Sequence, residues 1–232
     1  MFTFTLRHII ACILLLTTCL APSHAAAGGI ILGGTRIIYP SGEKQTSLSV
    51  RNTSEHSRFL VQSWLENEKG DKTHDFVVTP PLFVSNSGNE NSLRIMYTGQ
   101  PSLTDRETLY YFNAKAIPAV DKNESAERNV LMLAAVTRIK LFVRPAGLTP
   151  SVDEAPSMLN FKREGNTVKI ENPSPYYITL VNMKTGTTAL KDTMISPKQT
   201  LSVAIPNNTS DTISYSIIND YGAISPKINK KF

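Results

Sequence analysis

Short apolar stretches alternate with turn-forming residues along almost the whole chain after residue 28. The first stretch, Ile30 to Tyr39, contains Gly33-Gly34, and glycines inside a strand pattern indicate a kink or a switch between sheets. Six further stretches follow before residue 144: Thr46–Val50, Phe59–Leu65, Phe76–Thr79, Ser92–Tyr97, Thr108–Ile117 and Val130–Val143. Seven short strands in about 115 residues predict an immunoglobulin-like β sandwich.

A second, smaller set of strand-like stretches begins after residue 150. The segment 144–150 reads RPAGLTP, which ends the preceding strand and is typical of a linker. The later stretches are Met158–Phe161, Asn166–Ile170, Tyr176–Met183, Thr200–Ile205 and Thr212–Ile218. No stretch keeps a helical period of 3.6 residues, so we predict an all-β protein. Its two immunoglobulin-like domains would span residues 26–147 and 148–232.

The N-terminal segment has the layout of a secretory signal peptide. Arg7 precedes the apolar run Ile9–Leu16, and a small-residue stretch follows Pro22, which predicts removal of residues 1–25 by cleavage after Ala25. Eight apolar residues are too few for a bilayer, which needs about 20, so we do not expect the chain to be embedded in a membrane. The alternative is a lipoprotein anchor on Cys19, although Thr18 is unfavourable before such a cysteine.

Composition and charge exclude several kinds of function. The net charge of +5 comes from 24 basic against 19 acidic residues, with no run of five or six like charges, so we expect no nucleic-acid partner. Loss of residues 1–25 removes Cys12 and Cys19 and leaves His56 and His74 as the remaining histidines, so we expect no disulfide, no metal and no cofactor. The remaining 207 residues can bury a sufficient core without such cross-links.

The segment Val130–Val136 is apolar at all seven positions. A strand of an antiparallel sandwich normally alternates, with apolar residues facing the core and polar residues facing water. One interpretation is a central strand covered by the neighbouring domain or by a wide core. The other is that one face is offered to a partner, because a bare apolar strand promotes aggregation and an extended partner can pair with its backbone.

Two cations accompany this apolar strand. Arg36 lies in the first predicted strand, and Lys140 lies in otherwise apolar surroundings in the stretch TRIKLF, residues 137–142. Each taken alone is expected to be a solvated surface charge. If they meet in a cleft, they form a carboxylate-binding site, because charge-assisted hydrogen bonds contribute about 1.5–3 kcal/mol each.

Several longer motifs resemble one known family. They are 105–113 (DRETLYYFN), Ile117-Pro118, 129–145 (NVLMLAAVTRIKLFVRP), 172–177 (NPSPYY), Met194–Pro197 and 219–222 (NDYG). In this order, over nearly the whole exported chain, they closely resemble the periplasmic pilus-assembly chaperones of the chaperone–usher pathway. The connection from Ile117 to Asn129 is short, as in the short-loop class of that family.

The resemblance implies a fold and a function. It implies two immunoglobulin-like domains set at an angle with a cleft between them, and pilin subunits and the outer-membrane usher as partners. The chaperone would complete each subunit by donor-strand complementation in the periplasm, prevent its aggregation and deliver it to the usher. Such a protein is not an enzyme, and the sequence contains neither a phosphate-binding loop nor a G-x-S-x-G motif.

The resemblance also assigns roles to residues. The donor strand would present Leu131, Leu133 and Ala135, with Ile139 further along the same side; Arg36 and Lys140 would hold the C-terminal carboxylate of the subunit; and Glu107, Arg144 and Asp220 would tie the domains together. Ala135 is small for such a strand. Lys140 has the opposite parity to Leu133, which requires a twist or a cleft that wraps the strand.

Two other functions remain open on the residues alone. An exported adhesion or receptor module with two β sandwiches explains the strands and the signal peptide, but neither the pair of cations nor the doubly apolar strand. A secreted hydrolase is the second alternative. Neither His56 nor His74 lies in a recognisable catalytic motif, and both resemble polar loop residues.

Overall fold

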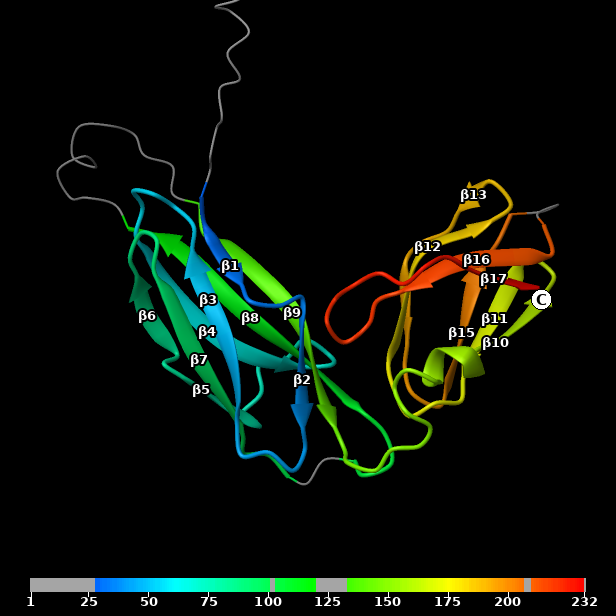
Figure 1. Cartoon of the computed structure of the whole chain (residues 1–232), viewed down its shortest axis with the longest axis horizontal. Coiled ribbons are helices and arrows are strands. Elements are labelled where there is room, and N and C mark those ends of the chain that lie inside the picture. The colour runs from blue at the N-terminus through cyan, green and yellow to red at the C-terminus, as the bar shows by residue number, and fades with distance from the viewer. Residues whose placement is uncertain (1–27, 101–102, 120–132, 207–209, 232) are drawn as a thin grey trace, which may run out of the picture.

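Two β lobes, joined at one end, form a V (Figure 1). The structure is a computed structural model, and it describes residues 28–100, 103–119, 133–206 and 210–231. The first lobe contains β1 (Ile30–Leu32), β2 (Arg36–Pro40), β3 (Thr46–Asn52), β4 (Phe59–Asn67), β5 (Phe76–Thr79), β6 (Leu82–Ser85), β7 (Glu90–Tyr97), β8 (Thr108–Pro118) and β9 (Ala135–Arg144). The second contains the 3-10 helix η1 (Ala155–Met158), β10 (Asn160–Glu164), β11 (Thr167–Asn172), β12 (Ile178–Thr185), β13 (Thr188–Ala189), β14 (Thr193–Ile195), β15 (Gln199–Ala204), β16 (Thr212–Ile217) and β17 (Ile228–Lys231).

The first lobe is a sandwich of two sheets with the orders β1-β3-β7-β5 and β2-β9-β8-β4-β6. Strand β2 runs parallel to β9, and the other pairs in this lobe are antiparallel. The chain passes from one sheet to the other between β1 and β2, at the predicted glycine pair. Gly33 donates its backbone N–H to the Ser49 carbonyl (2.9 Å), and a larger residue at position 33 would require the Ser49 hydroxyl to move.

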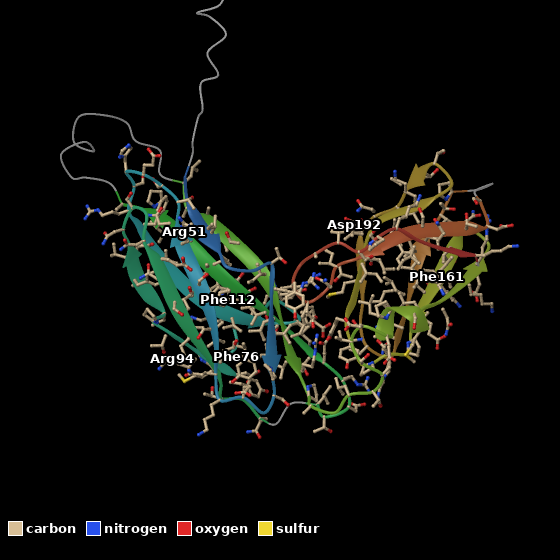
Figure 2. The ribbon with its side chains drawn as sticks, in the orientation of Figure 1. Arg51, Phe76, Arg94, Phe112, Phe161 and Asp192 are labelled. Atoms are coloured by element: carbon tan, nitrogen blue, oxygen red, sulfur yellow. The ribbon has the colours of Figure 1, made fainter. Side chains whose placement is uncertain are left out.

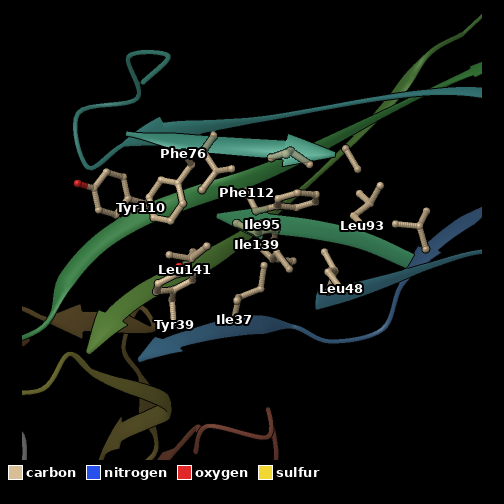
Figure 3. Packing of buried hydrophobic residues seen from close by; sticks show 14 of the residues in the cluster. Ile37, Tyr39, Leu48, Phe76, Leu93, Ile95, Tyr110, Phe112, Ile139 and Leu141 are labelled. Carbon is tan, nitrogen blue, oxygen red and sulfur yellow. The ribbon is translucent and has the colours of Figure 1, made fainter. Parts of the chain in front are cut away.

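Side chains from both sheets form the core of the first lobe (Figure 3). Phe112 of β8 and Leu93 and Ile95 of β7 are fully buried there. At one end, Tyr39 and Phe76 pack edge to face with ring centroids 5.8 Å apart, the geometry that aromatic quadrupoles favour. This core holds β8 and β9 in place without a disulfide.

The second lobe is a smaller sandwich with its own core. Its sheets have the orders β10-β11-β15 and β13-β12-β16-β17, and β14 pairs with β12. Ile170, Leu180 and Ile213 are fully buried between them. Figure 2 places Phe112 within the first lobe and Phe161 within the second, where Phe161 stacks on Tyr215 at 5.2 Å. Two separate cores confirm the predicted all-β fold of two sandwiches.

The structure adds strands that the apolar pattern did not predict: β6, β13, β14 and β17. Each has between two and four residues and lies at the edge of its sheet, where one row of hydrogen bonds is enough and a long apolar pattern is not required. In the described ranges no helix has the length and hydropathy needed to cross a bilayer.

The lobes also meet through a loop of the second lobe. The segment between β16 and β17 leaves the second sandwich and reaches the first lobe near β9 (Figure 1). This loop contacts Arg36 of β2 and Arg144 of β9.

Candidate functional site

Strand β9 is buried along one part of its length and exposed along the other. Its residues Leu141 and Val143 are fully buried in the first core. Leu133, just before the strand, and Ala135 have the same parity but are exposed, Leu133 to 72% of its surface. Beyond the core, the strand therefore carries a bare apolar side, as the second interpretation of Val130–Val136 requires; Leu131 lies outside the described residues.

The prediction for Ile139 is wrong in one respect. Ile139 has the parity of Leu133, as predicted, but only 9% of its surface is exposed and it packs in the first core. The opposite sheet covers β9 as far as this residue, so Ile139 stabilises its own domain. The exposed row ends before it.

The backbone edge of β9 is also open over this stretch. One edge pairs with β8 from Ala135 to Val143. The other pairs with β2 only from Lys140 to Arg144. Within the described residues, the edge from Ala135 to Ile139 has no strand beside it, so its N–H and C=O groups can pair with an added strand.

The structure brings Arg36 and Lys140 together. They are directly paired in the parallel register of β2 and β9, where the open edge ends. Lys140 lies on the face of β9 opposite to Leu133 and points to the second lobe, where its Nζ lies 3.4 Å from the Thr179 hydroxyl. Arg36 donates from Nη1 to the Ile218 carbonyl (3.1 Å). The parity difference is therefore real, because the two cations contact the second lobe while Leu133 and Ala135 have the opposite parity along the strand.

Arg36 and Lys140 are half-buried cations that interact with the second lobe through neutral oxygen atoms. Neither forms an ion pair with a carboxylate of the described residues. Burial lowers the pKa of Lys140, and the neighbouring Arg36 charge lowers it further. Burial also lowers the pKa of Arg36, partly offset by Asp220 and Glu107. A carboxylate placed between them would oppose both effects, because an opposite charge favours the protonated form of each group.

Glu107, Arg144 and Asp220 form one connected ion cluster between the lobes. Arg144 Nε donates to Glu107 (2.7 Å), and its two terminal nitrogens donate to the two Asp220 oxygens (2.6 and 2.8 Å). Glu107 also accepts the backbone N–H of Tyr177 (2.8 Å). Burial raises the pKa of Glu107 in spite of Arg144. Burial alone would lower the pKa of Arg144, but the hydrogen bonds that Arg144 donates to Asp220 and the charge of Glu107 raise it.

A cavity of about 400 Å³ lies beside this cluster, between the lobes. Its walls include Arg36 and Phe142 from the first lobe and Tyr177, Ile218 and Tyr221 from the second. The rings of Phe142 and Tyr177 pack at 5.5 Å, so the floor of the cleft is partly aromatic. The described residues contain no group of three or more side chains suited to hold a metal ion.

Sequence reasoning missed the partners that the second lobe supplies to this site. Thr179 and the Ile218 carbonyl contact the two cations, and Lys198 forms an ion pair with Asp105 of the first lobe (2.7 Å). Lys198 and Asp105 lie in or beside the quoted motifs. Nothing in the spacing of these residues indicates that they meet, because the contact depends on the angle between the lobes.

Comparisons with known proteins identify the family. The model for the N-terminal domain of PapD, described as a pili and flagellar-assembly chaperone, matches residues 29–149. The model for the PapD C-terminal domain matches residues 154–229. The chain belongs to the pilus-assembly chaperone family. Its members are chaperones and not enzymes.

Individual members of this family resemble the chain over most of its length. The probable fimbrial chaperone SfmC of Escherichia coli K12 is 47% identical over 89% of this chain and 90% of its own length. The chaperone FimC of the same strain is 44% identical over 88% of this chain and 84% of its own. The crystal structure of the periplasmic chaperone SfaE superimposes with a TM-score of 0.76 at 43% identity, covering 87% of this chain and 98% of SfaE.

The solved structure of a further relative contains a partner. Salmonella enterica SafB, crystallised as a chaperone in complex with the SafA pilin, is 30% identical to this chain with a TM-score of 0.79. The match covers 88% of this chain and 96% of the other. A family member with this fold therefore binds a pilin.

Proposed function

We propose that this chain is a periplasmic chaperone that binds pilin-type subunits by donor-strand complementation, with the exposed end of β9 as the donor strand. The observation that carries the proposal is the combination at β9 of an apolar side exposed at Leu133 and Ala135 with an open backbone edge from Ala135 to Ile139. A subunit that lacks a strand exposes an apolar groove. The added strand supplies both hydrogen bonds and apolar side chains to that groove.

The two cations determine where the C-terminus of the subunit lies along β9. Arg36 and Lys140 end the open edge of β9, so a C-terminal carboxylate held there fixes the register of the subunit strand against Leu133. Register matters because a slip of one residue turns every apolar side chain to the wrong face. The charge-assisted hydrogen bonds thus determine which side chains of β9 enter the groove.

The remaining steps need no nucleotide. A signal peptide in residues 1–25 would export the chain to the periplasm. At the outer-membrane usher, a segment of the next subunit would displace β9 by pairing with the same groove. Burial of more apolar surface by the incoming segment would drive the exchange.

Substitution of Leu133 by aspartate tests the proposal. The chain is co-expressed with pilin subunits in the periplasm and purified through a tag, and the bound subunit is identified by mass spectrometry. We expect Leu133→Asp to lose at least nine-tenths of the bound subunit, because the groove would have to bury a charge. The folded chaperone should be unaffected, since Leu133 is 72% exposed.

Val77→Asp is the matched control. Val77 of β5 is also an exposed apolar residue, at 44%, but lies in the sheet opposite to β9. This variant should retain the subunit. Wild-type amounts of subunit on Leu133→Asp would contradict the donor-strand role. An adhesion or receptor module would bind no pilin and would not suppress pilin aggregation.

A further inference from the structure

The loop between β16 and β17 is a tight, internally bonded turn. Gly222 donates its N–H to the Asn219 carbonyl (3.0 Å), and the Asn219 side-chain oxygen accepts the N–H groups of Tyr221 (3.1 Å) and Ala223 (2.9 Å). Gly222 has a φ of +82°, a conformation that favours glycine. The motif NDYG, residues 219–222, therefore encodes one turn conformation.

Three contacts hold this turn against the first lobe. Asp220 receives two hydrogen bonds from Arg144, and the Ile218 carbonyl receives one from Arg36. Gly222 lies so close to Thr35 that a Cβ atom on it would collide with the Thr35 hydroxyl. The backbone on both sides of Tyr221 is thus fixed.

The Tyr221 side chain is not packed in either core. It is 94% exposed, more than any other large hydrophobic residue in the described part of the chain. An aromatic ring on a fixed backbone loses little conformational entropy when it binds, and such rings frequently dominate binding energies at interfaces. Packing within the second lobe therefore does not explain why residue 221 is a tyrosine.

Tyr221 lies next to the cation site. It lines the same cavity as Arg36, whose guanidinium also binds the base of the turn. A chain whose C-terminal carboxylate binds Arg36 would end next to this turn, because Arg36 also donates a hydrogen bond to the Ile218 carbonyl at its base. The ring is thus continuous with the site that the proposed function requires.

We propose that Tyr221 is a positioning residue that packs against the last residues of a bound subunit, beside their terminal carboxylate. The inference rests on the proposed function and adds the second lobe to subunit recognition. The occupant is the end of the subunit's polypeptide, held by its carboxylate at Arg36 and Lys140 and covered by the Tyr221 ring.

Dissociation rates test this assignment. The probe is the pilin subunit identified with the wild-type chain, released from labelled complexes into excess unlabelled chaperone. We expect Tyr221→Ala to release it about tenfold faster, and Tyr221→Phe, which keeps the ring, to stay within about twofold of wild type. Ile224→Ala is the matched control, because Ile224 is exposed (58%) in the same loop between β16 and β17 but does not line the cavity.

A double-mutant cycle locates the contact. Each of the last three residues of the subunit is replaced by alanine with the terminal carboxylate kept, and release is measured from wild type and Tyr221→Ala. For one of the three, the tenfold effect of Tyr221→Ala should fall below about twofold, because the contact is already lost. Thermal unfolding of Tyr221→Ala should match wild type.

The outcomes separate the two proposals. Wild-type release from Tyr221→Ala, with capture lost in Leu133→Asp, would overturn the role of Tyr221 and leave the donor-strand function intact. The role of Tyr221 would also be overturned if Tyr221→Ala speeded release tenfold from the wild-type subunit and equally from all three substituted subunits. A lower unfolding temperature of Tyr221→Ala would give tyrosine a structural role instead. Absence of any captured subunit on wild type would overturn the proposed function itself.

Discussion

At the scale of single residues, the pairing of Arg36 with Lys140 is the feature that composition could least predict. The two lie more than a hundred residues apart, and each alone has the pattern of a surface charge. Family resemblance suggested that they act together. The structure supplies the physical reason, because parallel pairing of β2 with β9 places them side by side, half-buried and facing the second lobe.

The first prediction concerns the charge of Lys140. We expect Lys140→Ala to lower subunit capture at least tenfold, because one charge-assisted hydrogen bond to the carboxylate is lost. Lys140→Arg should retain capture. The measurement is the yield of complex with a subunit whose C-terminus is free or amidated; equal loss of both subunits in Lys140→Ala would contradict carboxylate binding.

The pH dependence of the same variants has a definite sign. Burial lowers the pKa of Lys140 below 10.5 in the folded chaperone, so its proton is lost before that of an unfolded lysine as the pH rises. Between the lowered pKa and 10.5 the unfolded chain binds more protons, and the free chaperone gains stability with pH. Over the same interval subunit affinity should fall for wild type but not for Lys140→Arg.

At the scale of elements, the sequence predicted that the segment Val130–Val136 is apolar on both faces. It did not predict where along β9 the core of the first lobe ends. Periodicity gives the parity of Leu133, Ala135 and Ile139 correctly. Periodicity does not show how far the opposite sheet covers β9, and this coverage is why Ile139 is buried while Ala135 is exposed. The glycine pair before β2 was easier to interpret, because glycines inside a strand pattern indicate a kink or a close approach of the backbone.

A second prediction follows from the small side chain at Ala135. Ala135 is exposed in the free chaperone, so a larger residue there should not strain the first core. If Ala135 faces the subunit groove, Ala135→Leu adds apolar surface to the contact and should slow subunit release about tenfold. The same dissociation assay measures this.

Ala134→Leu is the control for this change. Ala134 is exposed as well but has the opposite parity to Leu133 and Ala135, so its side chain would point away from the groove. Slower release from Ala134→Leu than from Ala135→Leu would show that the strand binds in the other register.

At the scale of the whole molecule, the angle between the lobes depends on contacts between distant residues. Glu107 and Arg144 belong to the first lobe and Asp220 to the turn of the second, and no local pattern indicates that they meet. The family motifs containing them suggested it. The structure adds that Glu107 also accepts the Tyr177 N–H, so one buried carboxylate contacts both Arg144 at the end of β9 and the second lobe.

The last prediction is that Arg144 keeps the cleft in shape. Arg144→Met leaves the Glu107 carboxylate, whose side chain is 1% exposed, without its cation. Breaking a buried ion pair on one side costs about 3–5 kcal/mol in free energy of unfolding, because a buried charge is left uncompensated. Asp220 is released at the same time, so we expect the lobes to separate, with a larger radius of gyration by small-angle scattering.

Removal of both charges distinguishes the cause. In the double variant Arg144→Met/Glu107→Gln the buried charge is gone, so denaturant unfolding should recover a large part of the lost stability. The radius of gyration should stay enlarged, because Asp220 still lacks its partner in the first lobe. Wild-type dimensions in the double variant would show instead that the other contacts between the lobes, such as Lys198 with Asp105, fix the angle without Arg144.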